Sequence, residues 1–258
     1  MVKKIFYVFL MLVFWTTLNM PVLAKQSEQI LPEEEGIYNI PGRPDLKLRV
    51  FVYHGKPDKP VKPTPTEPSL ICPVADPDSN ATVEGAGWVL PSSWTYRLNS
   101  NSVPTTVGSD NLANITISAF DEWLEAINNK VKVVRGADTT MAKAQLDGQN
   151  IITWGRASGN ALAVTYIWYN NQGVATEIDT IMNKSFTWYW SNNQSCAYEG
   201  VYDAQNILTH ELGHTFGLDD HYTSEYINNT MYGYGAKTET KKNTLTVGDR
   251  TGVASLYY

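Results

Sequence analysis

Residues 210–221 read His-Glu-Leu-Gly-His-Thr-Phe-Gly-Leu-Asp-Asp-His, and they decide how the whole chain is interpreted. Side chains at positions i and i+4 of a helix lie one above the other, so His210 and His214 would present their imidazoles to the same point. Neutral imidazoles suit zinc, and Glu211 beside them could accept a proton from a metal-bound water. This is the H-E-x-x-H spacing of zinc hydrolases, which predicts a zinc-binding helix.

The third metal ligand is predicted just beyond a turn. Gly217 can adopt the left-handed conformation that ends a helix and turns the chain back. A return three residues later would bring Asp220 to the metal, and His221, one residue further on, is the alternative third ligand. Three protein ligands would leave one position of a single catalytic zinc open to water.

The region after residue 80 has the periodicity of a globular domain. Apolar residues at helical spacing from Leu112 to Ile127 predict an amphipathic helix of about 17 residues, for which Ser109 and Asp110 are candidate N-caps. Apolar runs predict five strands, at residues 94–99, 131–135, 150–154, 161–169 and 174–182. The long helix that follows them predicts an α/β (α+β) architecture, with helices packed on a sheet.

The pattern H-E-x-x-H-x-x-G-x-x-D of residues 210–220 resembles the extended zinc motif of the metzincin proteases, in which the last position is usually His. Residues 218–222 are similar to the snapalysin branch, where Asp is the third ligand and is followed by His-Tyr. The stretch 229–234 is similar to the Met-turn, which implies that Met231 forms an apolar floor beneath the metal without binding it. The resemblance implies a twisted mixed sheet, a long zinc-binding helix, a Met-turn and a C-terminal helix.

Matrixins, one branch of the metzincins, are similar to more of the chain. Four further segments have matrixin-like counterparts in the same order, at residues 94–98, 119–123, 175–188 and 245–257. By this resemblance, a substrate would lie extended along an edge strand at 161–169 and pair with it main chain to main chain. Animal matrixins hold a second, structural zinc largely through histidines. His54 is the only histidine left over here, which excludes such a site.

The N-terminal part of the chain is predicted to be an export signal followed by an extension. Residues 1–24 carry two lysines, an apolar run too short to span a bilayer and a small residue at a cleavage position, the layout of a signal peptide. Residues 25–80 are predicted to be a propeptide or N-terminal extension, with one strand at 46–53 and a Pro- and Lys-rich linker at 55–68. The catalytic domain would occupy residues 81–258, and the mature protein would be secreted and free of the membrane.

Net charge and cysteine content limit the binding partners and the covalent links that we expect. The chain has 20 Lys and Arg against 26 Asp and Glu, a net charge of −6, which argues against a general nucleic-acid partner, and we expect a monomer. Cys72 and Cys196 are the only 2 cysteines, and an exported chain usually pairs them. The alternative is a cysteine switch of the matrixin kind, in which the Cys72 thiolate occupies the open position of the metal.

Asp147 and Asp179 are candidate calcium ligands, although acids in loops are more often simply solvated.

Together these features predict a secreted zinc endopeptidase that hydrolyses peptide bonds of extended protein substrates, with Glu211 as the catalytic base. Two other classes stay open. One is a secreted adhesion or binding module with a protease-like fold and a structural zinc, for which His221 could supply a fourth ligand. The other is a zinc hydrolase that acts on a non-peptide bond.

Overall fold

A computed structural model describes residues 30–56, 67–157 and 159–258 of the chain. The signal peptide predicted for residues 1–24 and most of the linker predicted at 55–68 lie outside the described residues. Within the described part, no helix is long and apolar enough to cross a membrane.

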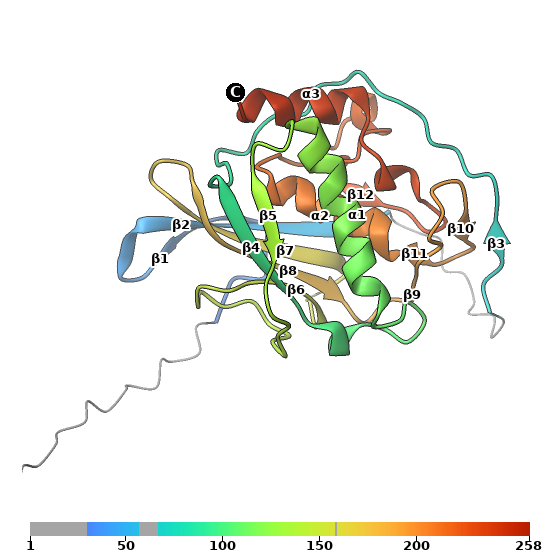
Figure 1. The fold of residues 1–258 in the computed structure, drawn as a ribbon, viewed down its shortest axis with the longest axis horizontal. Coiled ribbons are helices and arrows are strands. Elements are labelled where there is room, and N and C mark those ends of the chain that lie inside the picture. The colour runs from blue at the N-terminus through green and yellow to red at the C-terminus, as the bar shows by residue number, and fades with distance from the viewer. Residues whose placement is uncertain (1–29, 57–66, 158) are drawn as a thin grey trace, which may run out of the picture. The chain divides into compact units, whose positions relative to one another are not determined.

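One mixed sheet of 8 strands runs through residues 31–258. Its order is β1-β2-β7-β8-β6-β4-β5, with β12 pairing with β2 off this path (Figure 1). The strands are β1 (Gly36–Ile40), β2 (Arg43–Gly55), β4 (Ser93–Leu98), β5 (Lys132–Arg135), β6 (Asn150–Gly155), β7 (Ala161–Asn170), β8 (Ala175–Asn183) and β12 (Tyr234–Gly235). Strands β4, β5, β6 and β8 are parallel, whereas β7 is antiparallel to both of its neighbours. The five strands predicted from apolar runs are all present.

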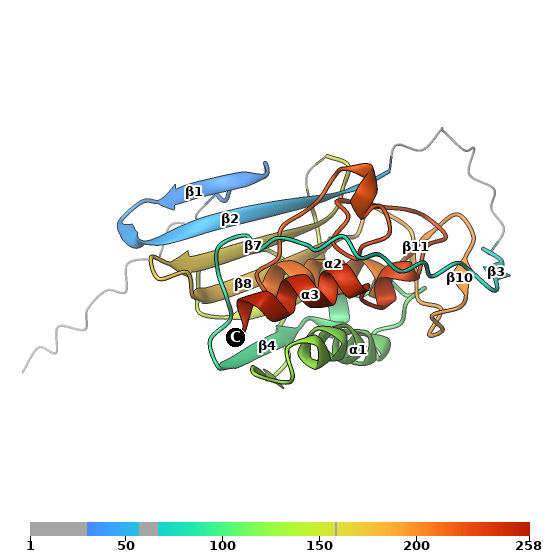
Figure 2. The same ribbon diagram turned by 90° about the horizontal axis from the view of Figure 1, so that it is seen from above.

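Three α-helices lie on one side of this sheet, as Figure 2 shows. They are α1 (Asn111–Ala126), α2 (Ala204–Thr215) and α3 (Val247–Leu256), with single 3₁₀ turns at Ser100–Ser102, Ser224–Tyr226 and Lys241–Asn243. The predicted apolar stripe, from Leu112 to Ile127, lies in the main core cluster, except that Leu124 is only partly buried and packs against it. Asp203 caps α2, because its carboxylate accepts hydrogen bonds from the amides of Gln205 and Asn206, each at 3.0 Å.

Strand β2 is the main difference from the sequence-based expectation. The sequence predicts a strand at 46–53, but as part of a propeptide or N-terminal extension outside the catalytic domain. Instead β2 pairs with β7 over nine positions, from Leu46 opposite Asn170 to His54 opposite Ala161. Its side chains alternate: Leu48, Val50 and Val52 are buried in a second apolar cluster, and Phe51 and Tyr53 in the main core. Strand β7 is therefore not an edge of the sheet in this structure, which corrects the expectation of a free edge at 161–169.

Two short strand pairs lie outside the main sheet. Strand β3 (Leu70–Ile71) pairs with β10 (Ala197–Tyr198), and β9 (Trp188–Tyr189) pairs with β11 (Tyr202–Asp203). Cys72 and Cys196 form a disulfide beside the first pair, with their Cα atoms 4.4 Å apart. In this structure the Cys72 sulfur is thus bonded to Cys196 and is not available as the thiolate of a cysteine switch.

Candidate metal centre

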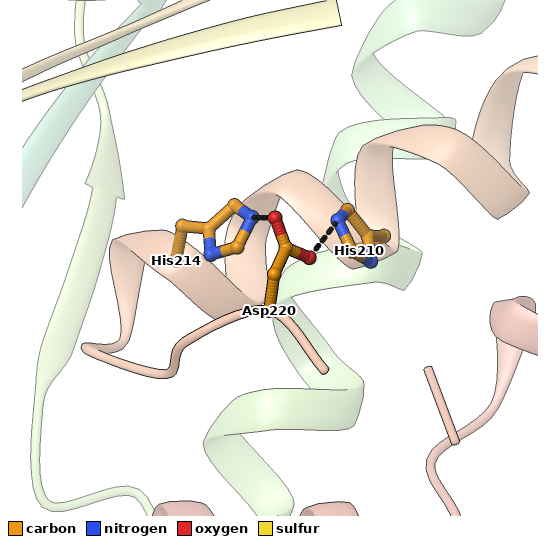
Figure 3. A group of neighbouring side chains, drawn as sticks. All are labelled: His210, His214 and Asp220. Atoms are coloured by element: carbon orange, nitrogen blue, oxygen red, sulfur yellow. Dashed lines mark ion pairs between the residues drawn. The ribbon is translucent and has the colours of Figure 1, made fainter. Parts of the chain in front are cut away.

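Three potential metal ligands meet at the C-terminal half of α2. The helix presents His210 and His214 from successive turns, and the carboxylate of Asp220 lies between their rings (Figure 3). Asp220 Oδ1 is 3.2 Å from His210 Nε2, and Asp220 Oδ2 is 3.6 Å from His214 Nε2. One ligand atom from each residue lies within 4.8 Å of the others, so a single ion could contact all three side chains.

The turn after α2 brings Asp220 to this point. Gly217 has φ +95°, in the left-handed region, and a Cβ atom there would lie 2.1 Å from the carbonyl oxygen of Trp88. Only glycine fits both the backbone angle and this close approach. The chain therefore reverses directly after the helix and returns along it.

The two imidazoles are oriented by backbone carbonyls. The Nδ1 atom of His210 donates to the carbonyl of Thr230 at 2.8 Å, and that of His214 donates to the carbonyl of Leu218 at 3.0 Å. A proton on Nδ1 leaves Nε2 as the acceptor nitrogen, and both Nε2 atoms point at Asp220. A backbone carbonyl is one of the usual partners by which proteins fix the orientation of a metal-binding histidine.

The donor set fits zinc. The Nε2 atoms of His210 and His214 and Oδ1 of Asp220 are buried without a hydrogen-bond partner. Burial lowers the pKa of His214 to about 3 and holds that of His210 well below its usual range, so both rings are neutral. Two neutral imidazoles and a carboxylate are ligands that Zn²⁺ prefers. Buried acceptor atoms without a partner destabilise a fold unless something, such as a metal ion, binds them.

His221 lies outside this group. Successive residues of an extended chain point to opposite sides, so the return that directs Asp220 inward directs His221 outward. Its Nε2 atom accepts a hydrogen bond from the amide of Glu84 at 3.0 Å, and its ring stacks on Tyr226. In this arrangement it is not a fourth ligand.

Glu211 lies beside the histidines and is completely buried. Its Oε2 atom accepts a hydrogen bond of 2.5 Å from the hydroxyl of Thr165 on β7, while its Oε1 atom has no partner. Burial raises the pKa of Glu211 to about 8, and the nearby Asp220 adds to this shift. A carboxylate with a raised pKa and one free oxygen is suited to accepting and returning a proton near neutral pH.

The loop expected to be a Met-turn packs beneath α2. A Cβ atom on Gly213 would lie 2.1 Å from Sδ of Met231, so the missing side chain lets the methionine lie directly against the helix. The buried carboxylate of Asp249 on α3 accepts hydrogen bonds from the amides of Thr230 and Met231, at 2.8 and 3.2 Å. These bonds fix the loop whose carbonyl at Thr230 orients His210.

Strand β2 covers the site. The ring of Phe51 stacks on His214 with centroids 3.7 Å apart and planes 7° apart, and the ring of Tyr53 stacks on His210, also at 3.7 Å. Both histidines are 0% exposed as a result. Neither aromatic contact was expected, because the sequence shows only that Phe51 and Tyr53 lie in a strand.

Lys242 is a further residue whose role the sequence does not reveal. It is 0% exposed and donates hydrogen bonds to the Tyr53 hydroxyl and to the carbonyls of Tyr232 and Tyr234. Burial lowers the pKa of Lys242 to about 8, an effect that Glu239 partly opposes. In the sequence, Lys242 lies in a polar stretch that is typical of a solvent-exposed surface.

The two predicted calcium ligands, Asp147 and Asp179, accept hydrogen bonds from backbone amides. Asp179 accepts hydrogen bonds from Gln145 and Ile151, each at 3.0 Å. The neighbouring Glu177 accepts from the amides of Asp147 and Gly148. These carboxylates stabilise the loop before β6, and calcium binding there stays a prediction.

The fold and site are those of the metzincin class of metallopeptidases. In this class a helix carries two histidines four residues apart, and a glycine turn brings a third ligand back to them, here Asp220 in place of the usual His. The sequence profile of the matrixin family matches residues 87–258, and the chain belongs to this family. The match confirms the predicted matrixin-like fold. Matrixins are zinc-dependent metalloendopeptidases, so this chain is a metalloprotease with peptide or protein substrates. The sequence matches none of the curated proteins with which it was compared.

Proposed function

We propose that the protein is a secreted zinc endopeptidase in which His210, His214 and Asp220 hold the metal and Glu211 acts as the general base. One observation carries this proposal: the unpartnered Nε2 atoms of two neutral histidines and an unpartnered carboxylate oxygen converge beside a buried glutamate. Secretion is supported by the signal-like residues 1–24 and by the Cys72–Cys196 disulfide, since disulfides persist in oxidising compartments.

The metal, when bound, supplies the Lewis acidity that polarises a peptide carbonyl and acidifies water. The protein supplies the rest. Glu211 accepts a proton on its free Oε1 atom and later returns it to the leaving amine, while Thr165 holds the other oxygen and so fixes the plane of the carboxylate. Thr230 and Leu218 keep the imidazoles directed at the metal.

Zinc content and casein cleavage, measured together on the full chain, test the proposal. Because β2 covers the site, cleavage is assayed in a chain that carries Tyr53→Ala, with thermal unfolding as the check that it folds. We expect one zinc per chain and cleavage of casein, and the further change Glu211→Ala should abolish cleavage while the zinc stays bound. Cleavage that survives Glu211→Ala would overturn the assigned base. A folded, zinc-loaded Tyr53→Ala chain that releases zinc to a chelator faster than the wild type, and so has an opened site, but cleaves no protein would overturn the proposed function.

A further inference from the structure

Strand β2 fills a gap between two strands that border the metal site. On one side it pairs antiparallel with β7, and on the other it pairs in parallel with β12, where Tyr234 lies opposite His54. The amide of Lys56 extends this pairing with a hydrogen bond to the carbonyl of Gly235 at 2.8 Å. Without β2, the main chains of β7 and β12 would both be free to bind an extended peptide, the usual mode of strand addition.

The register places the backbone of β2 across the metal site. Phe51 contacts the ring of His214 and Tyr53 contacts the ring of His210, so Val52 lies between the two ligands. Two peptide bonds, 51–52 and 52–53, lie between these contacts, and we assign the second as the one equivalent to a cleaved bond because the side chain that follows it, Tyr53, enters a pocket beside His210. Hydrolysis of such a bond adds the oxygen of water to the carbonyl carbon and transfers a proton to the leaving amine nitrogen.

The side chain of Tyr53 occupies a closed pocket with a cation at its end. One face of the ring lies on His210, and a Cβ atom on Gly235 would come within 3.1 Å of its edge. The ammonium group of Lys242 meets the phenol oxygen and is held in place by the carbonyls of Tyr232 and Tyr234. A buried donor of this kind is satisfied by a hydroxyl and left unsatisfied by a purely apolar side chain of the same shape.

We propose that β2 occupies the substrate cleft as a substrate would, and that the Lys242 pocket selects protein substrates with tyrosine directly after the cleaved bond. This inference rests on the proposed function. The segment Gly36–Gly55 then keeps the cleft closed in the intact chain, and Tyr53 is the residue by which it imitates a substrate.

Zinc release to excess chelator tests the closure without any assay of activity. Opening of β2 must precede release, so weaker binding of Tyr53 should accelerate it. We expect Tyr53→Ala to speed release at least about tenfold and Tyr38→Ala, a tyrosine on the same hairpin without a contact to the ligands, to change it little. Equal rates in wild type and Tyr53→Ala, both folded by thermal unfolding, would overturn the closure.

A double-mutant cycle on the same release rate tests Lys242. Tyr53→Phe removes only the hydroxyl and should speed release about tenfold in the Lys242 chain, but hardly at all in a Lys242→Met chain. If the two changes are additive, the hydroxyl does not act through Lys242. The Tyr53→Phe change alone keeps the test usable if Lys242→Met fails to fold, since a rate unchanged by that substitution also contradicts the pocket assignment.

Selectivity is measured with three peptides of the sequence of residues 46–55, carrying Tyr, Phe or Leu at the position of Tyr53. We expect the Tyr53→Ala chain to cleave the Tyr peptide before the tyrosine, with kcat/KM about tenfold above that of the Phe peptide, and Lys242→Met to remove the difference. Equal cleavage of all three peptides, or cleavage at another bond, would overturn the inference and leave the protease intact. Faster zinc release without cleavage of any peptide or of casein would instead contradict the proposed function.

Discussion

The hydroxyl of Thr165, on β7, donates a fully buried hydrogen bond to Oε2 of Glu211, on α2. Thr180 of β8 lies 3.1 Å from the same hydroxyl and donates to it, because the Thr165 proton is already engaged by the carboxylate. The sheet thereby fixes the orientation of the expected base. This contact also stabilises the charged form of Glu211, so it opposes the effect of burial on the pKa.

Thr165→Val should therefore impair catalysis more than binding. In the Tyr53→Ala background we expect kcat for a peptide substrate to fall about tenfold with KM nearly unchanged, because Thr165 positions the base and does not contact the substrate. Thr165→Ser keeps the hydroxyl and should restore most of the rate. A rise in KM at constant kcat, or a failure of Ser to rescue, would contradict the positioning role.

Zinc content distinguishes the predicted roles of Asp220 as a metal ligand and His221 as a residue outside the metal site. Asp220→Ala removes one of three converging ligands and should lower zinc affinity by at least about tenfold. His221→Ala should keep one zinc per chain, since its Nε2 atom bonds to the amide of Glu84. The measurement is zinc per chain after dialysis against a metal buffer. The reverse pattern would make His221 the ligand.

Much of this site was predictable because its signals are local. The i, i+4 histidines, Gly217 and the return to Asp220 lie within eleven residues, and backbone geometry over such a distance follows from helix periodicity and turn chemistry. The helix α1 and the strands β4 to β8 follow from apolar patterns in the same way.

The partners of β2 could not be predicted, because they are fixed only by tertiary packing. The alternating run at 46–53 indicates a strand, but its neighbours β7 and β12 are more than one hundred residues away in the sequence. The same holds for Lys242, whose burial depends on Tyr53 and on two carbonyls of the loop before β12. The contact of Thr165 with Glu211 could not be predicted either, because threonine is common in strands and nothing in the sequence distinguishes this one.

Asp249 should be important for stability. Its carboxylate accepts hydrogen bonds from two loop amides and from the hydroxyl of Thr246, all of them buried. Asp249→Asn replaces one acceptor oxygen by a donor and should lower the free energy of unfolding by about 2 kcal/mol. Urea unfolding at constant m-value checks this prediction, and a loss below about 0.5 kcal/mol would show that the loop is held by other contacts.

The disulfide should contribute stability and no control of activity. Its two cysteines are 124 residues apart, and closing a loop of that length typically stabilises a protein by roughly 2–5 kcal/mol. Replacing both cysteines by Ser should lower the unfolding free energy in this range. It should leave the rate of zinc release from the folded chain unchanged, because the sulfur is not a metal ligand. Faster release would favour a thiolate at the metal.

Removal and return of the metal test the central claim most directly. The full chain carrying Tyr53→Ala is assayed for casein hydrolysis as purified, after dialysis against a chelator, and after addition of one equivalent of zinc. The account predicts that hydrolysis is lost with the metal and returns with zinc, and that a chain also carrying Glu211→Ala takes up the same zinc without regaining hydrolysis. Hydrolysis that persists in the metal-free chain would contradict the account.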